Sequence, residues 1–246
     1  MIGDDDLYRR GVDTLVASWE QYARGVPGAA MLRAPGVTAA VFTREPERRV
    51  YNNAVAERDL AAADRAAALE AAEAAYAAAG VGRFALWVHE RDPAMRRDVE
   101  RRGYALDTTT RAMGMALGDV ALPRPDIELA TVEWEVYLRA FDMPAGLLRG
   151  ADLAAFAILV AQTGGEPVAT AMAFDHGADC GIYNVGTVEH ARRRGFGAAL
   201  TALHLHDAVA RGCETASLQA TPMAERMYAS VGFRDLGRYL EFVPTR

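Results

Sequence analysis

The 246-residue chain is 51% hydrophobic and carries a formal net charge of −6 at pH 7. That hydrophobic share supports a packed core and excludes a disordered chain. Because the molecule as a whole is acidic, we expect no nucleic-acid or membrane partner, and any bound anion must be held by a local basic cluster.

The cysteines, the histidines and the N-terminal stretch exclude further classes. Cys180 and Cys213 form no CxxC pair and provide no disulfide framework. His204 and His206 lie two residues apart on an expected helix and point in different directions, so we expect no metal site. The acidic start, MIGDDDLYRR, has no apolar signal core, and the chain has no apolar run of membrane-spanning length, which predicts a cytoplasmic protein.

The first half alternates short apolar runs with helical patterns. Helical spacing predicts a helix over 5–24, and the alanine-rich stretch 56–80, which ends in Gly80, predicts a second. Pro93 marks the start of a third helix, over 92–103. The apolar runs predict strands at 29–34, 36–42, 48–55, 83–90 and 110–117, the first three as a meander.

A break in the pattern divides the chain. The stretch GDVALPRPDI, residues 118–127, contains two prolines and little periodicity, as is typical of a linker. We therefore predict one domain over 1–118, a linker over 119–126, and a second domain over 127–246.

The second half shows a similar order of elements. We predict helices at 131–141, from 196 to about 211, and at 223–232, and strands at 154–164, 166–175, 180–188, 215–221 and 237–243. In both halves a helix, a glycine, a strand and a second helix lead to a Gly-aromatic pair, Gly103-Tyr104 or Gly232-Phe233, and then to a strand. This repetition favours two similar α/β domains in tandem.

The segment ARRRGFGAAL, residues 191–200, places three arginines directly before a glycine-rich turn that opens a helix. The first N–H groups of a helix have no internal partners and, together with the peptide dipoles, attract anions. Neither a P-loop nor a dinucleotide fingerprint fits, because no Lys-Ser/Thr pair follows Gly197 and Leu200 occupies the third glycine position. From these residues alone, an anion site and a solvated basic helix start both stay open.

Two motifs resemble a known family. The stretch TVEHARRRGFGAAL resembles the acyl-CoA-binding motif of the GNAT superfamily of N-acetyltransferases, and Arg192, Gly195 and Gly197 fill that motif in order. The stretch MYASVGF, residues 227–233, resembles the second signature of the family, a tyrosine followed after three residues by Gly-Phe. Glu189 and Thr221 depart from the proline and the asparagine that are common in the family at these places.

The resemblance covers about residues 127–246 and implies a set of roles. Together with the repeated order of elements, it implies an α/β fold of two tandem GNAT-like domains, each with a central mixed β-sheet flanked by helices. Acetyl-CoA would be the cosubstrate, and Tyr228 would assist departure of the thiolate. The residues implied in cofactor binding are Val185, Gly186, Thr187, Arg192, Arg193, Arg194, Gly195, Phe196, Gly197 and Ala198.

The first half is predicted to be a degenerate, non-catalytic copy. Its stretch AERDLAAAD contains no glycine, so its backbone is not suited to holding a pyrophosphate. When Gly103-Tyr104 is aligned with Gly232-Phe233, Val99 falls where Tyr228 stands, and valine cannot donate a proton.

These observations predict an acetyl-CoA-dependent N-acetyltransferase whose acceptor is a small-molecule amine or a peptide. A non-enzymatic acyl-CoA-binding sensor and a transferase with another donor, such as succinyl-CoA, are the alternatives. An alkyl ammonium must lose a proton before it attacks, so a base or a water chain is required. The sequence does not single out the base among Glu189, His190, Glu225, Tyr183 and Gln219.

Overall fold

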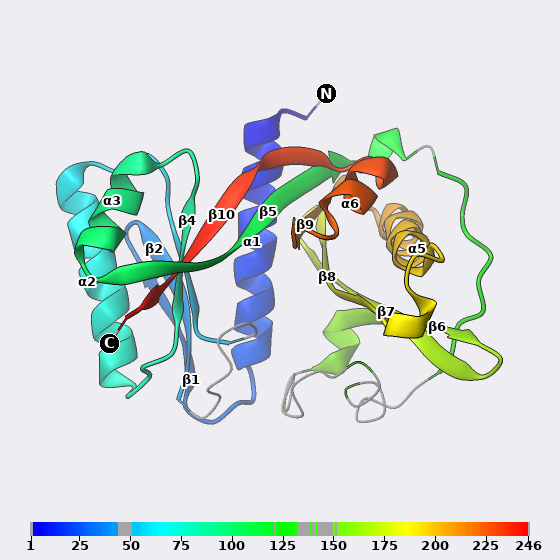
Figure 1. Ribbon diagram of the computed structural model, residues 1–246, viewed down its shortest axis with the longest axis horizontal. Helices are drawn as coiled ribbons and strands as arrows, with labels where there is room; N and C mark the ends of the chain where they lie inside the picture. Colours follow the sequence, from blue (N-terminus) through cyan, green and yellow to red (C-terminus); the bar gives the residue numbers. More distant parts are fainter. Residues whose placement is uncertain are drawn as a thin grey trace. The chain divides into compact units, whose positions relative to one another are not determined.

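The computed structural model describes residues 2–43, 51–120, 122–131 and 152–245, together with 138, 141 and 150 (Figure 1). Its contacts divide the chain into two compact units. Unit 1 comprises Met1–Ala17, Ala112–Leu147 and Asp152–Leu236, and unit 2 comprises Ser18–Arg111, Leu148–Ala151 and Gly237–Arg246.

The two units are interleaved along the sequence. Helix α1 (Asp4–Ala23) begins in unit 1 and ends in unit 2, β5 (Tyr104–Ala116) runs from unit 2 into unit 1, and β10 (Arg234–Pro244) runs from unit 1 into unit 2. Neither unit is therefore a continuous stretch of chain. The domain boundaries at 118 and 127 stay a sequence-based prediction.

Unit 2 is a mixed sheet with helices on one face. Strands β1 (Ala29–Ala34), β2 (Val37–Phe42) and β3 (Asn53–Ala56) form the expected antiparallel meander. Strand β4 (Ala85–His89) runs parallel to β3 and antiparallel to β10, and the strand order is β1-β2-β3-β4-β10-β5. Helices α2 (Ala62–Ala78) and α3 (Pro93–Arg101) bury an apolar face that includes Leu69, Tyr76 and Val99 on these strands.

The alanine-rich helix begins six residues later than its composition indicated. The prediction of a start at residue 56 is wrong, because Ala56 still belongs to β3 and Asp59 has a φ of 61°, in the left-handed region. An L-residue in that region interrupts a right-handed helix. Composition reports helix propensity, but it does not report where the backbone must turn.

Unit 1 repeats the arrangement of strands and helices. Its order is β10-β5-β9-β8-β7-β6, and α5 (Phe196–Arg211) and α6 (Glu225–Val231) pack on one face through residues such as Leu205 and Val231. The strands are β6 (Phe156–Thr163), β7 (Glu166–His176), β8 (Asp179–Thr187) and β9 (Thr215–Ala220). Short 3-10 turns lie at Leu117–Asp119, Leu153–Ala155 and Glu189–Ala191. The helix predicted at 131–141 lies largely outside the described residues.

Helix α1 covers the other face of the unit 1 sheet. Ala216 and Leu218 point into the core beneath α5, so Ser217, which lies between them in the strand, points to the opposite face. There α1 approaches very closely, because a Cβ on Gly11 would lie 3.0 Å from the Cβ of Ser217. Although α1 has 20 residues, no helix in the described part of the chain is both long and apolar enough to cross a bilayer.

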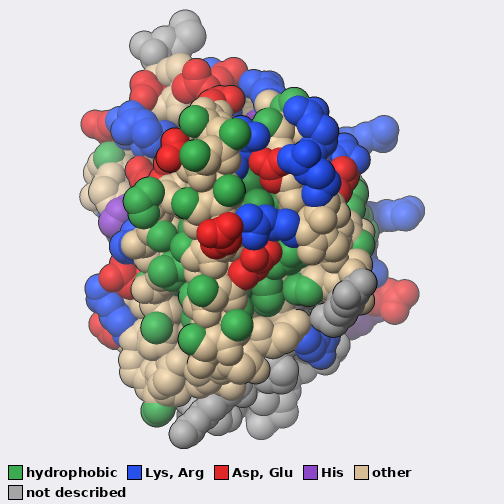
Figure 2. Space-filling view, turned by 90° about the vertical axis from the view of Figure 1, so that its left-hand side faces the viewer, with side chains coloured by type: hydrophobic (Ala, Val, Ile, Leu, Met, Phe, Trp, Pro, Cys, Tyr) green, Lys and Arg blue, Asp and Glu red, His purple; other side chains and the backbone are tan. Residues whose placement is uncertain are grey.

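The face of the molecule shown in Figure 2 carries acidic and basic side chains side by side, with small hydrophobic side chains between them. In unit 2, α2 contributes exposed alanines, and α3 contributes arginines that pair with nearby carboxylates. The exposed face of this alanine-rich helix can stay helical because alanine favours helix formation even where its side chain is not buried.

The buried His204 gives unit 1 a predicted pH dependence. Its side chain is fully buried on α5, and burial lowers the pKa of His204 from 6.5 to about 4. The unfolded chain therefore binds a proton that the folded chain excludes, so stability is full above pH 6.5 and falls toward pH 4 by about 1.4 kcal/mol per pH unit. Chemical denaturation of the whole protein between pH 4 and 7 measures this slope.

The matched variants are His204→Leu, which should remove that slope, and His190→Gln, at an exposed position, which should keep it. An unchanged slope in the His204→Leu protein would contradict this assignment of the pH dependence.

Candidate active site

The candidate site lies where the parallel strands β8 and β9 separate. Strands β8 and β9 pair from Asp179–Thr215 to Gly181–Ser217. Within the described residues their pairing ends there, although β8 continues to Thr187 and β9 to Ala220. Beyond Gly181 the edge of β8 that faces β9 is left open, so an extended ligand can pair with its backbone groups there.

A β-bulge shapes the open part of β8. In the antiparallel pairing with β7, Thr170 lies opposite Gly186 and Met172 opposite Tyr183, so Asn184 and Val185 together face one residue. Asn184 has a φ of 52°, and asparagine is one of the few non-glycine residues that adopt this conformation readily. The bulge changes the direction of the backbone next to Val185 to Thr187, three of the residues expected to bind the cofactor. Asn184 was not among the residues expected from sequence.

The turn after β8 exposes the start of α5. Arg193 and Gly195 both have left-handed backbones, with φ of 62° and 87°, and Gly195 is the residue that precedes the helix. No side chain caps the helix, and the first helical bond runs from the N–H of Ala199 to the carbonyl of Gly195. The N–H groups of Phe196, Gly197 and Ala198 therefore point out of the helix start, where anions bind.

The three arginines have different surroundings, and all are exposed. The Nε of Arg192 donates to the carbonyl of Thr187, 3.3 Å away, which ties the turn back to the end of β8. The guanidinium of Arg194 lies over the ring of Phe196, 5.2 Å from its centroid. An exposed guanidinium held at a helix start is well placed to contact a phosphate group.

Tyr228 lies in the core on the same face as α5. It is 6% exposed, and its ring packs edge-on against Phe233 at 5.9 Å. The same cluster contains Ile182 of β8 and Leu218 of β9, on either side of the separation. Burial raises the pKa of the Tyr228 hydroxyl, so the group keeps its proton at neutral pH.

Gly197, in the first turn of α5, lies close to residues of both β8 and α6. A Cβ on Gly197 would lie 3.7 Å from both the Cγ1 of Val185 and the Cε of Met227. The end of β8, the start of α5 and the helix that carries Tyr228 are thus in contact. Two of the residues that the sequence assigned to cofactor binding, Val185 and Gly197, therefore lie next to Met227, the neighbour of Tyr228 in the chain, and the roles assigned to these residues stay predictions.

The residues considered as bases lie in several different places. Glu189 and His190 are exposed on the 3-10 turn that follows β8, and Glu225 begins α6. By strand alternation Tyr183 and Gln219 point to the sheet face away from α5. In the part of the chain that the structure describes, no three His, Cys, Asp or Glu side chains are grouped to hold a metal ion.

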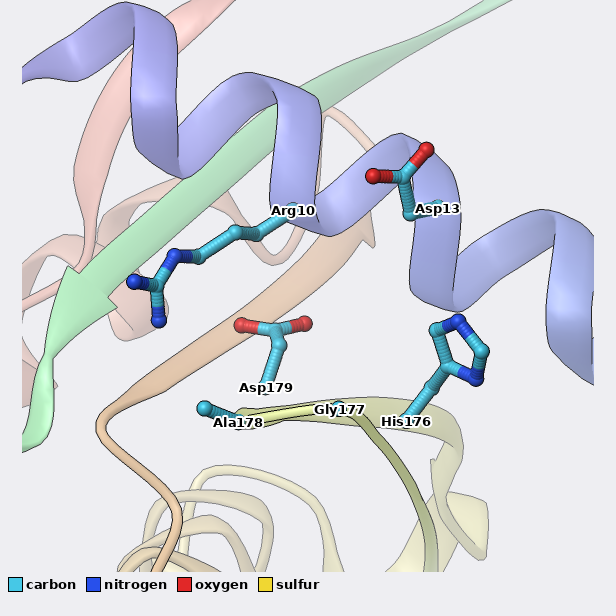
Figure 3. A pocket seen from close by; sticks show the side chains of 6 residues that line it. All are labelled: Arg10, Asp13, His176, Gly177, Ala178 and Asp179. Atoms are coloured by element: carbon cyan, nitrogen blue, oxygen red, sulfur yellow. The ribbon is translucent and has the colours of Figure 1, made fainter.

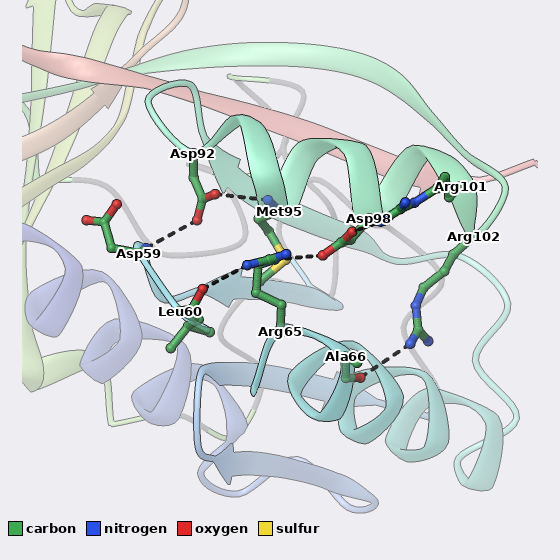
Figure 4. A network of polar contacts seen from close by, with 9 residues as sticks. All are labelled: Asp59, Leu60, Arg65, Ala66, Asp92, Met95, Asp98, Arg101 and Arg102. Atoms are coloured by element: carbon green, nitrogen blue, oxygen red, sulfur yellow. Dashed lines mark hydrogen bonds and ion pairs between the residues drawn. The ribbon is translucent and has the colours of Figure 1, made fainter. Parts of the chain in front are cut away.

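In unit 2 the segment between β3 and α2 corresponds to the turn that precedes α5. Side chains of unit 2 itself hydrogen-bond to the backbone of this segment (Figure 4). The carboxylate of Asp92 accepts the N–H groups of Asp59, at 3.3 Å, and of Met95, at 2.9 Å. Arg65 donates to the carbonyl of Leu60 at 2.8 Å and to Asp98 at 2.6 Å, which joins α2 to α3. A carboxylate at this turn would repel a phosphate, which supports the prediction of a non-catalytic copy. Val99 is fully buried in α3.

The comparison with protein families decides the identity of the second half. Residues 127–233 match the model of the Acetyltransferase (GNAT) family. This segment is a GNAT acetyltransferase domain. No curated protein matches the chain. The matched range includes the open edge of β8, the start of α5 and Tyr228, so the GNAT resemblance inferred from two short motifs is confirmed.

Solved structures share the fold over nearly the whole chain. A GCN5-related N-acetyltransferase from Kribbella flavida aligns with a TM-score of 0.71 and 21% identity, covering 96% of each chain. One from Sphaerobacter thermophilus gives 0.63 and 18%, covering 84% of this chain and 76% of that one. A tandem GNAT protein from the clavulanic acid biosynthesis pathway gives 0.59 and 14%, covering 98% and 95%. The predicted α/β fold with tandem GNAT-like architecture is confirmed.

Two glycines of the turn should respond differently to alanine. Gly195→Ala places a Cβ on a left-handed residue and should lower the free energy of unfolding by about 1–2 kcal/mol. Gly197→Ala meets its neighbours at ordinary contact distance and should leave stability unchanged or raise it by up to about 1 kcal/mol. Urea denaturation of both variants measures the difference, and equal losses would contradict the assigned backbone geometry.

Proposed function

We propose that the chain is an acetyl-CoA-dependent N-acetyltransferase that acetylates a primary amine by direct attack on the thioester. The observation that carries the proposal is the contact of the open edge of β8 with the uncapped start of α5 and the helix of Tyr228. The acceptor is proposed to be a small-molecule amine or a peptide.

The donor would be held mainly by backbone groups. The N–H groups at the start of α5 would bind its pyrophosphate, where Gly195 leaves open space and the exposed Arg192, Arg193 and Arg194 add positive charge. Backbone groups of Val185 to Thr187 would pair with the pantetheine arm. A backbone N–H of β8 near the bulge at Asn184 would stabilise the charge that develops on the thioester oxygen.

Tyr228 would act on the departing sulfur through a hydrogen bond. A phenol of pKa about 10 is a weaker acid than a thiol of pKa about 8.5, and burial raises the pKa of Tyr228 further. Complete proton transfer to the thiolate is therefore unfavourable. Donation of a hydrogen bond as negative charge grows on sulfur lowers the barrier without that transfer.

Replacement of Tyr228 by phenylalanine tests this role. Tyr228→Phe keeps the ring in the core, so acetyl-CoA affinity should stay within about twofold, while turnover should fall by about 10²- to 10³-fold. Thiol release with an amine library gives the turnover, and calorimetric titration of acetyl-CoA gives the affinity.

The control is Phe233→Leu, which alters the same aromatic contact but removes no hydroxyl group. A wild-type protein that binds acetyl-CoA but releases no thiol with any amine would favour the sensor alternative. Full turnover in the Tyr228→Phe variant would remove Tyr228 from the mechanism.

A further inference from the structure

Asp179, at the start of β8, holds the neighbouring strand β9 through its side chain. It is 2% exposed, and it is the one buried carboxyl among the described residues of unit 1. Its two oxygens accept the hydroxyl of Thr215 at 2.7 Å and that of Ser217 at 2.6 Å. Both hydroxyls belong to β9, so one carboxyl of β8 accepts two hydrogen bonds from the next strand. These two bonds are called the Asp179 bridge below.

The two hydroxyls lie at opposite ends of the pairing between β8 and β9. Thr215 is opposite Asp179 itself, in the first residue pair, and Ser217 is opposite Gly181, in the last. The Asp179 bridge therefore spans the whole paired stretch and reaches the point where the strands separate. So short a pairing has few backbone bonds, and parallel pairing is slightly less stable per residue than antiparallel pairing.

Gly181 leaves the last pair without a side chain of its own to pack across the strands. A Cβ on Gly181 would lie 2.2 Å from the hydroxyl oxygen of Tyr183, so the Tyr183 side chain occupies that space and requires glycine there. Cross-strand side-chain contacts contribute much of the stability of a sheet. At this pair, the hydrogen bond from Ser217 to Asp179 supplies such a contact between β9 and β8.

On its other side the carboxyl of Asp179 faces a cavity (Figure 3). The cavity has a volume of about 310 Å³ and lies between α1 and the turn that joins β7 to β8. The residues that line it are Arg10, Asp13, His176, Gly177, Ala178 and Asp179. Arg10 pairs with Glu214 at 2.9 Å, and among the described residues no cation forms an ion pair with Asp179. The hydroxyls of β9, rather than a cation, therefore hold this carboxyl in place.

We propose that Asp179 is a positioning residue for acetyl transfer, which fixes the point where β8 and β9 separate and thereby the place where the β8 backbone meets the thioester. This inference rests on the proposed transferase function. The pyrophosphate would be held at the start of α5, and the pantetheine arm would run back along the open edge of β8 toward Gly181. If the pair of Gly181 and Ser217 opened, the separation would begin one pair earlier, and the β8 backbone beside the thioester would shift.

Such a shift would affect the reaction more than donor binding. Acetyl-CoA affinity would come largely from the pyrophosphate contacts at the start of α5, to which the Asp179 bridge does not belong. Transfer requires the thioester oxygen to lie in register with a backbone N–H of β8, and a misplacement of about 1 Å can lower a rate by about 10²-fold. A residue that only supported the fold would change neither quantity while the protein stays folded.

The test removes the two hydroxyls of the Asp179 bridge one at a time. With a primary amine that the wild type acetylates, Ser217→Ala should lower kcat/KM for the amine by about tenfold at saturating acetyl-CoA. Thr215→Val, at the far end of the pairing, should lower it less, and Thr215→Ser, which keeps the hydroxyl, should restore it. Calorimetric titration should give acetyl-CoA affinities within about twofold of the wild type for every variant that circular dichroism shows to be folded.

Hydrogen–deuterium exchange supplies a second readout that does not depend on turnover. The amides of residues 180–185 should exchange faster in the Ser217→Ala protein than in the wild type, because the last pair opens more often. Asp13→Asn is the matched control, since it alters a carboxyl that lines the same cavity from α1 but lies outside the pairing of β8 with β9. It should change neither kcat/KM nor this exchange.

The outcomes separate this inference from the proposed function. An unchanged kcat/KM in the folded Ser217→Ala protein, or an equal loss in the Asp13→Asn protein, would overturn the positioning role alone. If Ser217→Ala does not fold, equal kcat/KM values for Thr215→Val and Thr215→Ser would overturn it in the same way. A wild type that acetylates no amine would refute the proposed function and the positioning role with it.

Discussion

The short parallel pairing of β8 with β9 is the constraint on which the site depends. Three residue pairs hold the strands together, and Asp179 reinforces them by accepting the hydroxyls of Thr215 and Ser217 on the neighbouring strand. Where this pairing stops, the backbone of β8 becomes available to a ligand. The bulge at Asn184 lies in this unpaired part of β8, and the turn that follows leads to the uncapped start of α5.

The interleaving of the units shapes how the chain must fold. The last strand, β10, continues from unit 1 into unit 2, where it pairs with β4, and β5 continues from unit 2 into unit 1. Each unit therefore needs residues from both halves of the sequence to complete its sheet. A chain built in this way cannot be divided at its proline-rich stretch without removing strand residues from each unit.

The sequence predicted most elements and the cofactor segment, because these depend on local patterns. Alternating apolar runs give the strands, Pro93 and Gly80 mark helix ends, and the Arg-Gly-Phe-Gly turn identifies the start of α5. The late start of α2 was missed because composition does not report backbone dihedrals. Asn184 and Asp179 were missed because their roles depend on strand register, which residues distant in sequence determine. An asparagine within an apolar strand was the one local signal for the bulge.

Calorimetric titration of acetyl-CoA tests the central claim, that the start of α5 and the open edge of β8 hold the donor. The comparison is between the wild type and an Arg194→Glu, Gly195→Trp double variant, which reverses one charge and fills the open space at the turn. The account predicts micromolar binding to the wild type and its loss in the variant, with the variant still folded by circular dichroism. Binding that survives in the variant, or no binding to the wild type, would contradict it.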